Sequence, residues 1–465
     1  MKDITYNVRI YKTEAIPGKR RTLHRVRWKV GDKAWRRSFH TAAQADSFRS
    51  ELSTATRKGE AFSLATGEPV SWARSRQPKI SWYDFVCRYV DMKWKAASAK
   101  YRRDIARAMV AATPPLIVEN PPASDLELRS AMTNWGFNTK RRPDAPAEVA
   151  ELLRWLSENT RPLRDLAAPG VAREVLEAAT SRLDGQRAAP DTVRKHRMLL
   201  SNAMDYAIEL ELLDSNPIKA IKWRLPTTST TREVDRRSVV NHRQARSLLA
   251  AVKAQEPSGP RLVAFFALMY YSGLRPEEAI NVDRNAITLP PATEPNAWGD
   301  LHLSSAAPHA GSHWTNDGSL RETRALKHRV EGESRPVPIP PHLVAILRTH
   351  LAEFPDGPEG RLFYGVRAAT LPSTTYMQAW RAARKTALTP RERASPLAGR
   401  PYDLRHACVS TWLNAGVSAP QVAEWAGHGV DVLLKIYAKC VDGQDEIAKR
   451  RIAAALAEED EDDTR

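Results

Sequence analysis

Cysteine is scarce in this chain of 465 residues. The three cysteines, Cys87, Cys408 and Cys440, lie far apart and are odd in number. This excludes a disulfide framework and a metal clip of closely spaced cysteines, and it favours a reducing cytoplasm. Long apolar runs are also missing, since the longest nearly uninterrupted one covers residues 262–271, about half of what a membrane span requires. No apolar segment follows the basic N-terminal residues, so we expect neither a secretory signal nor a membrane partner.

Acidic residues are fewer than basic ones, with 54 Asp and Glu against 71 Lys and Arg and a net charge of +17. A surplus of this size favours a polyanionic partner, and nucleic acid is the leading candidate. The chain is 42% hydrophobic and 27% charged, which allows a packed core and excludes wholesale disorder. At roughly 150 residues per domain, the length predicts about three domains.

Breaks in composition divide the chain into four predicted segments. Residues 67–78 are polar and interrupted by Gly and Pro, and residues 226–231 are a Thr/Ser run after a proline, so both are predicted to be linkers. We therefore expect a first domain over residues 1–66, a helical domain over 79–225 and an α-rich domain over 236–457. Six consecutive acids at 458–463 indicate a self-repelling acidic tail over 458–465.

The first domain is predicted to be a small three-stranded sheet followed by one helix. Apolar and polar residues alternate over residues 6–11, 23–30 and 34–39, and Thr41 is expected to cap the helix. Residues 1–78 also carry 17 basic and only 7 acidic side chains. A basic β-ribbon fits the major groove of DNA, although a solubilising face is the other interpretation. The basic residues assigned to DNA contact here are Arg25, Arg27, Lys29, Arg36 and Arg37.

The second segment is expected to hold helices over residues 81–112, 147–158, 171–182 and 191–212. In the last of these, apolar residues recur at helical spacing, and Arg194, Lys195 and Arg197 stand in the first turns. Cations at that end oppose the helix dipole unless an anion lies nearby. These three residues are therefore predicted to contact DNA phosphate as well.

The third segment carries the side chains needed for phosphoryl transfer through a tyrosine. Arg275 precedes Pro276, a favoured first residue of a helix, so it is predicted at a helix N-terminus where anions bind. Glu278 follows three residues on, and a long insertion of unassigned role covers residues 284–326. Residues 326–330, which contain Lys327, and residues 334–339 are predicted to form a β-hairpin with a short polar turn. From the residues alone, an exposed turn lysine is the simpler interpretation of Lys327. The remaining residues of this kind are Tyr402, Arg405, His406, His428 and Tyr437.

These motifs resemble those of the tyrosine recombinase (phage integrase) family. Ser-Gly-Leu-Arg275, Lys327 before Ser-Arg-Pro-Val-Pro, Asp-Leu-Arg405-His, Gly-His428 and Tyr437 nine residues later all occur in the family's order. The match covers about residues 235–457, and the upstream segments resemble an arm-type DNA-binding domain and a helical, SAM-like core-binding domain. The resemblance implies a multidomain, mainly α fold of the three-domain mobile-element integrase type, with a mixed α+β catalytic domain.

The resemblance also implies five catalytic residues. Tyr437 would attack a DNA phosphodiester, expel a 5′-hydroxyl and form a 3′-phosphotyrosyl bond. Arg275 and Arg405 would hold the non-bridging oxygens. Lys327 would protonate the leaving oxygen, and His428 would bond to the phosphate or help to deprotonate the tyrosine. Because the phosphotyrosyl bond retains the energy for rejoining, neither metal nor ATP is implied, and the three histidines within 302–313 lack metal-ligand spacing.

One departure from the family's pattern concerns Tyr402, which occupies the first position of the His-x-x-Arg box. A tyrosine is a poor base near neutral pH because its pKa is near ~10. Either His428 then carries the proton transfer, or His406 contributes from its adjacent position. Glu278, Tyr402 and His406 are accordingly predicted as supporting residues.

Two functions from different classes follow. The first is a site-specific DNA recombinase (integrase) that integrates or excises a phage or mobile element in the bacterial cytoplasm, at the nucleoid. Its expected partners are double-stranded DNA with core and arm sites, three further copies in a tetramer, and an accessory directionality or DNA-bending protein. The alternative is a catalytically impaired DNA-binding or architectural protein that keeps the recombinase fold and has lost activity through Tyr402. Cleavage of a nicked site separates the two.

Overall fold

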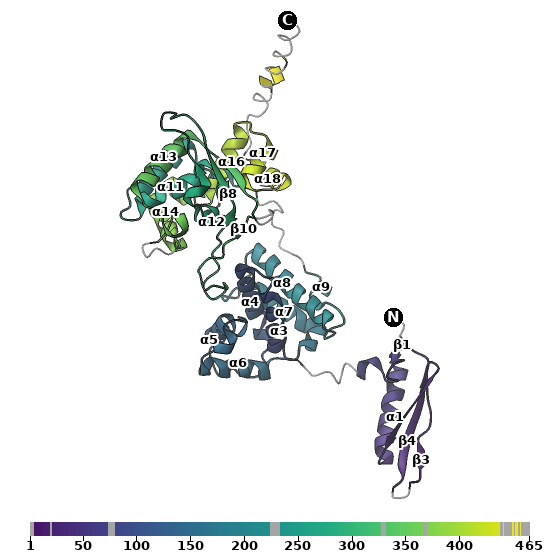
Figure 1. The fold of residues 1–465 in the computed structure, drawn as a ribbon. Coiled ribbons are helices and arrows are strands. Elements are labelled where there is room, and N and C mark those ends of the chain that lie inside the picture. Colours follow the sequence, from purple (N-terminus) through teal and green to yellow (C-terminus); the bar gives the residue numbers. More distant parts are fainter. Residues whose placement is uncertain are drawn as a thin grey trace. The chain divides into compact units, whose positions relative to one another are not determined.

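The computed structural model describes residues 4–18, 21–72, 80–223, 233–326, 332–365, 370–437, 440, 449–450, 452–453 and 456. Within it, the chain separates into two compact units, residues 1–81 with 162–164 and residues 82–161 with 165–465. Helices predominate and the sheets are small, as predicted (Figure 1). The division of the chain into three domains, with an acidic tail beyond them, stays a prediction.

The first unit is a small sheet packed on helix α1 (Ala42–Arg57). The central strand is β4 (Leu23–Val30), and β5 (Lys33–Phe39) pairs along one of its edges. Two short strands, β2 (Val8–Ile10) and β3 (Glu14–Ile16), pair with the two ends of the other edge. The sheet thus has four strands where three were predicted. The three predicted strands correspond to β2, β4 and β5, and β3 is the additional one. A further pair joins β1 (Ile4–Thr5) to β6 (Phe62–Ser63).

Alternation along β4 places its apolar side chains against α1. Val26 and Trp28 are 0% and 3% exposed, and the Trp28 ring packs edge-on to Phe48 of α1. Thr41 caps α1, since its Oγ accepts a hydrogen bond from the backbone N–H of Gln44 at 3.3 Å. The polar stretch after residue 66 contributes to this core as well, because the Trp72 ring lies 5.4 Å from Phe48.

Residues 82–220 are helical. The predicted helix over 81–112 is two helices, because Ser98 begins the second one and its Oγ accepts the backbone N–H of Tyr101. The remaining boundaries lie within a few residues of those predicted. The helices are α3 (Trp82–Trp94), α4 (Ala99–Ala112), α5 (Asp125–Ala131), α6 (Ala147–Asn159), α7 (Pro169–Thr180), α8 (Pro190–Glu209) and α9 (Pro217–Ala220).

Residues 236–437 combine helices with short strands around a core of their own. Helix α11 (Gly259–Tyr271) contains the predicted apolar run and is almost entirely buried. It packs against α10 (His242–Lys253), α13 (Pro341–Glu353) and α16 (Asp403–Asn414). The other helices are α12 (Pro276–Ala279), α14 (Ser373–Ala387), α15 (Pro390–Ala394), α17 (Ala419–Ala426) and α18 (Val430–Tyr437).

Most of the first strand of the hairpin predicted around Lys327 falls on residues outside the described ranges, so the hairpin stays a prediction. The described strands on either side of residues 327–331 have other partners. β11 (Arg335–Ile339) pairs with β8 (Gly299–Leu303), which also pairs with β7 (Ile287–Thr288). β10 (Arg324–Ala325) pairs with β9 (Ser305–Ala306). Both of these strands pair with the segment 299–306, which precedes them in sequence.

The insertion before Lys327 extends to the helical residues 82–220 and docks on them. Arg102 of α4 donates hydrogen bonds to the Trp314 carbonyl at 3.0 Å and to Asn316 Oδ1 at 2.7 Å. Arg103 donates to the Ala310 carbonyl at 2.8 Å, and Lys140 donates to the Asn316 carbonyl at 2.9 Å. Basic side chains thus satisfy backbone carbonyls that a long loop otherwise leaves to solvent.

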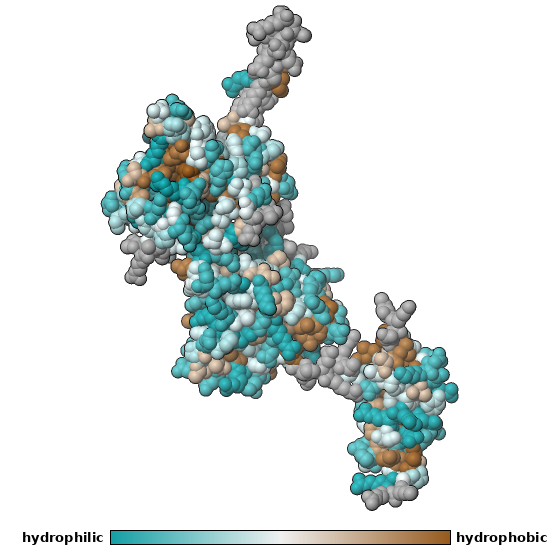
Figure 2. All heavy atoms as spheres, viewed as in Figure 1, coloured by the Kyte–Doolittle hydropathy of each residue, from teal (hydrophilic) through white to brown (hydrophobic). Residues whose placement is uncertain are grey.

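Hydrophilic side chains cover most of the visible surface, and apolar ones appear in small patches (Figure 2). Among the helices of the described ranges, none combines the length and the apolar composition required to span a membrane.

Candidate functional site

Arg275 occupies the residue before α12, as its Pro276 neighbour predicted. Its backbone N–H donates to Glu278 Oε2 at 2.9 Å, and its Nη1 donates to Oε1 at 2.7 Å. The free amide that was expected to bind an anion is therefore taken by Glu278. The guanidinium itself keeps some access, because 16% of the Arg275 side chain is exposed.

Glu278 is shared by further arginines. Arg335 at the start of β11 binds it in a bidentate manner, with Nη1 to Oε1 at 3.0 Å and Nη2 to Oε2 at 2.9 Å. Arg405 Nη1 lies 3.8 Å from Oε2. Burial by itself raises the pKa of Glu278, but the charges of Arg335 and Arg275 outweigh it and hold this pKa well below its ordinary value of 4.5. Glu278 is therefore ionised throughout the neutral range.

Arg405, in the first turn of α16, is 0% exposed. Its Nη1 donates to the carbonyl of Gly273, and its Nη2 donates to the carbonyl of Ala426 and contacts His428 Nε2 at 3.0 Å. Its Nε is buried and has no hydrogen-bond partner among the described residues. Burial, followed by the charge of Arg275, lowers the pKa of Arg405. A guanidinium remains cationic at neutral pH even so.

Both arginines are held by consecutive carbonyls at the C-terminal end of α17. Arg405 takes Ala426, and Arg275 Nη2 donates to the Gly427 carbonyl at 2.9 Å. The last carbonyls of a helix have no partner within it and carry partial negative charge, so cations are favoured there. Gly427 ends α17 with a φ of +59°, and a Cβ at this position would overlap the Arg335 guanidinium. The turn therefore requires glycine for two separate reasons.

Tyr437 is the last residue of α18 and is 0% exposed. Its Oη lies 2.9 Å from Nδ1 of His406, and the two rings are 5.7 Å apart. Burial raises the pKa of Tyr437, and the nearby charge of Arg405 opposes this only in part. The phenol is therefore protonated in this structure.

Two histidines adjoin the Tyr437 ring, and both are neutral at pH 7. Burial and the charge of Arg405 lower the pKa of His406 to about 4, with a smaller contribution from Arg400. The same two causes lower the pKa of His428 to about 3. The ring of Tyr402 lies edge-on to His406 at 5.1 Å. The structure thus places Tyr402 beside the histidine that contacts the Tyr437 hydroxyl.

Most of the site residues predicted from the motifs come together here. They are Arg275, Glu278, Tyr402, Arg405, His406, His428 and Tyr437. Lys327 lies outside the described residues. Arg335 was not among the predicted site residues. It stands in the Ser-Arg-Pro-Val-Pro motif, but that motif was assigned only to a strand and no role was given to its arginine. The available signal of its burial was that positions 335, 337 and 339 lie on the same face of the strand, and Val337 and Ile339 are core residues.

The basic face of the first unit is formed as predicted by Arg25, Arg27 and Lys29 on β4, since their neighbours Val26 and Trp28 face α1. Arg36 lies directly across from Arg27 on β5. Arg27 forms an ion pair with Glu14 at 2.5 Å.

Arg37 differs from the other basic residues of these strands, because it lies opposite Val26 on the face that α1 covers. Its guanidinium rests over the Phe48 ring at 5.1 Å and is 3.6 Å from Glu68. It is therefore separate from the basic face.

The cations at the start of α8 have acidic partners within the chain. Arg194 lies 3.2 Å from Asp191, and Lys195 forms an ion pair with Asp104 of α4. Arg197 donates to the Ile221 carbonyl at 3.4 Å. The anion that the helix dipole requires is thus supplied by aspartates, and a role of these three residues in DNA contact stays a prediction.

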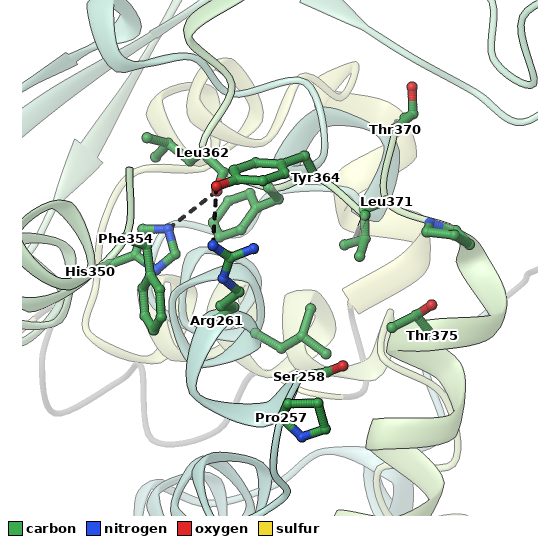
Figure 3. Close-up of a pocket in the computed structure, with 14 residues that line it drawn as sticks. Pro257, Ser258, Arg261, His350, Phe354, Leu362, Tyr364, Thr370, Leu371 and Thr375 are labelled. Atoms are coloured by element: carbon green, nitrogen blue, oxygen red, sulfur yellow. Dashed lines mark hydrogen bonds between the residues drawn. The ribbon is translucent and has the colours of Figure 1, made fainter. Parts of the chain in front are cut away.

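A pocket of about 550 Å³ lies elsewhere in the same region, between α11, α13 and α14 (Figure 3). Arg261 lies over the Phe354 and Tyr364 rings and donates to Tyr364 Oη at 3.1 Å. None of the predicted site residues lines this pocket. In the described ranges, no group of three or more His, Cys, Asp and Glu side chains is placed to hold a metal ion.

No family model and no curated protein matches this chain. Among solved structures, it is similar to the Tn1549 transposon integrase in complex with a circular intermediate DNA, with a TM-score of 0.44 and 14% identity over 67% of this chain and 96% of that one. It is similar to XerH site-specific recombinase bound to a palindromic difH substrate, with a TM-score of 0.45 and 12% identity over 80% and 97%. It is also similar to a lambda integrase dimer bound to a core site, with a TM-score of 0.42 and 11% identity over 89% and 91%.

Proposed function

We propose that this chain is a tyrosine recombinase of the integrase type, a DNA strand transferase that cleaves and rejoins DNA through Tyr437. The observation that carries this proposal is a charge imbalance beside the buried hydroxyl of Tyr437. The guanidinium groups of Arg275, Arg335 and Arg405 share the single carboxylate of Glu278, so these four side chains together carry a net charge of +2.

A buried excess of cationic charge is unfavourable unless an anion compensates it. Two of the three guanidiniums are fully buried, and Arg275 is the one that reaches the surface. A phosphodiester carries one negative charge and gains more as it is attacked. The site is therefore better matched to the transition state of phosphoryl transfer than to solvent, which is the requirement for catalysis.

The role of each arginine follows from how accessible its guanidinium group is to a bound phosphate. Arg275 has a second N–H on each Nη and is partly exposed, so it is suited to bind a non-bridging oxygen in the geometry that planar guanidinium groups favour. The Nη groups of Arg405 are engaged by carbonyls and His428, so Arg405 contributes mainly charge unless one carbonyl is exchanged for the phosphate. Tyr437 attacks the phosphorus, and the 5′-oxygen leaves with a proton from Lys327. No metal ion or ATP is needed.

The basic face of the first unit supports a second DNA contact, and we infer that it binds an arm site. Arg27 and Arg36 lie directly opposite each other, and like charges in that position destabilise a sheet. Glu14 offsets the charge of Arg27 within the chain, and DNA phosphate would offset the remaining positive charge of this face. From these features we propose that the chain acts as a tetrameric integrase. The tetramer would bridge the core and arm sites of a mobile element.

The test is a covalent adduct. We expect the full chain to form a phosphotyrosyl bond with nicked duplexes tiled across the DNA that flanks its coding region, because the nick lets the cleaved strand diffuse away. Tyr437→Phe removes only the hydroxyl, so it should abolish the adduct and leave DNA binding unchanged. Adduct formation by this variant overturns the assignment of the nucleophile. Tyr364→Phe is a matched control, since Tyr364 lines the separate pocket.

The alternative function, a DNA-binding or architectural protein without strand transfer, is favoured by one outcome of the same assay. If the wild-type chain binds one of the tiled duplexes with high affinity and yields no adduct, the recombinase proposal fails and the architectural one takes its place.

A further inference from the structure

His406 contacts the atom that the proposed reaction uses as its nucleophile. Its Nδ1 lies 2.9 Å from Tyr437 Oη, which is hydrogen-bond distance for a base and the proton it accepts. Both side chains lie on helices that are anchored in the core, His406 in the first turn of α16 and Tyr437 at the end of α18. Leu404 and Leu433, buried neighbours on these two helices, are both 0% exposed.

The direction of this hydrogen bond follows from the protonation states of its partners. Burial keeps the Tyr437 phenol protonated and the His406 imidazole neutral. A neutral imidazole has one nitrogen that accepts, and a phenol is a better donor than a neutral imidazole N–H. The phenol therefore donates to Nδ1, and the proton already points at the base.

His428 is poorly placed for the same task. Its Nε2 is 3.0 Å from Arg405 Nη2, and because a guanidinium only donates, the accepting lone pair of His428 is occupied. Its Nδ1 is buried and has no partner in the described part of the chain. The His428 and Tyr437 ring centroids are 6.3 Å apart. His428 is thus suited to hold Arg405 and to donate, whereas His406 places its Nδ1 at the phenol oxygen.

Tyr402 holds the position at which the resembled family has a histidine, and His406 follows four residues later. Residues i and i+4 lie on the same face of a helix, one turn apart, and the two rings are in contact here. A base at 406 therefore serves the same face of α16 as a base at 402.

We propose that His406 is a catalytic residue, the general base that takes the proton of Tyr437 as the phenol attacks DNA; this rests on the proposed function. The Oη–H bond breaks as Nδ1–H forms, the Oη–P bond forms, and the P–O5′ bond breaks with a proton from Lys327. In the rejoining step the 5′-hydroxyl gives its proton back to the neutral Lys327 amine as it attacks the phosphorus. The P–O5′ bond forms, the P–Oη bond breaks, and the imidazolium returns its proton to the departing Tyr437 oxygen. No oxidant or cofactor enters this sequence.

We expect bound DNA to change the pKa of His406. The charge of Arg405 lowers the pKa of His406 in the free protein, second only to burial. A phosphate bound beside Arg405 offsets that charge, so it raises the pKa of His406 toward the neutral range where proton transfer is efficient. His406 would then be an effective base only when substrate is present.

The experiment uses the full chain and a nicked duplex that gives an adduct with the wild type, in two forms. One form has the natural 5′-bridging oxygen, and the other has sulfur there, which leaves as a thiolate without a general acid. His406→Asn keeps an acceptor near the place of Nδ1 but takes no proton at neutral pH. General acid–base catalysis is worth roughly 10²–10⁴-fold, so we expect the single-turnover rate to fall by about 100-fold or more on both duplexes.

Three results would overturn this proposal. If the cleavage rate of His406→Asn stays within about threefold of the wild-type rate, His406 is not the general base. If the sulfur-substituted duplex restores the rate of the variant, His406 assists protonation of the leaving oxygen instead. A faster rate makes it a lock that keeps Tyr437 in a resting position. If His406→Asn does not bind the duplex, His406→Gln is judged by the same rates. His302→Asn is the matched control, because His302 is exposed on β8. Failure of the wild type to form any adduct overturns the proposed function itself, which is a distinct result.

Discussion

Replacement of Glu278 by glutamine tests whether the arginine cluster depends on one buried carboxylate. Glu278→Gln keeps the shape of the side chain but removes its charge and one of its two acceptor oxygens. Arg335 then loses one of its two hydrogen bonds, and the amide group faces guanidinium donors. Removal of one partner from a buried ion pair costs about 3–5 kcal/mol, because the remaining charge stays buried without compensation. We expect a loss of that size in the free energy of unfolding.

Urea unfolding measured by tryptophan fluorescence checks this value, because Trp380 and Trp412 lie in the same core as the site. With an m-value of about 3 kcal/mol/M, the midpoint should fall by about 1–1.7 M. Glu277→Gln is the matched control. It changes the same charge one residue away on a partly exposed side chain, so its effect should stay below about 1 kcal/mol.

The pH dependence gives the refuting result. The pKa of Glu278 is lower in the folded chain than its ordinary value of 4.5, so its stabilising contribution is complete above that value and is lost as the pH falls below it. The stability difference between wild type and Glu278→Gln should therefore shrink between pH 5 and pH 3. A difference that is the same at pH 7 and at pH 3.5 would show that the carboxylate charge is not what holds the cluster.

Two further variants test the turn after α17 and the basic face. Gly427→Ala should destabilise the chain by more than about 2 kcal/mol, because it adds an overlap with Arg335 to the cost of a left-handed backbone, about 1–2 kcal/mol. Gly360→Ala, with a φ of +71° and open space around it, should show only the second part in the same urea titration. Arg27→Ala with Arg36→Ala should reduce the salt slope of DNA binding by about 2 without loss of thermal stability; an unchanged slope returns this face to a solubilising role.

The elements of the fold that the sequence predicts well are those with a local signal. Alternation identifies β4 and β5, and Thr41 marks the start of α1. The apolar run of α11 and the proline after Arg275 likewise place the first arginine of the site at the end of a turn. Each of these patterns lies within about twenty residues, so it can be recognised without knowing which distant segment the element packs against.

Pairing between distant segments left no such local signal. β11 pairs with β8 across the loop that contains residues 307–323, and no periodicity within β11 specifies that partner. The docking of this loop on Arg102 and Arg103 is equally invisible, because arginines bind backbone carbonyls, which every sequence has. The expected hairpin around Lys327 stays a prediction, because most of its first strand lies outside the described residues.

Within the site, the motifs indicated which residues matter but not how the charges are shared. Arg335 completes the cluster only because β11 directs it at Glu278 and the glycine at 427 leaves room for its guanidinium. Its role depends on the pairing of β11 with β8, which no local pattern contains.

The departure at Tyr402 is where sequence and structure together say more than either alone. By the family's pattern, a tyrosine at this position removes a base and argues for a protein that binds DNA without cutting it. The structure shows a histidine one helical turn further on, with its Nδ1 2.9 Å from the Tyr437 hydroxyl oxygen, while Nε2 of His428 contacts Arg405. An architectural protein has no need of a buried tyrosine hydroxyl aligned with an imidazole, nor of three guanidiniums around one carboxylate. The departure is therefore better explained as a relocated base than as a lost one.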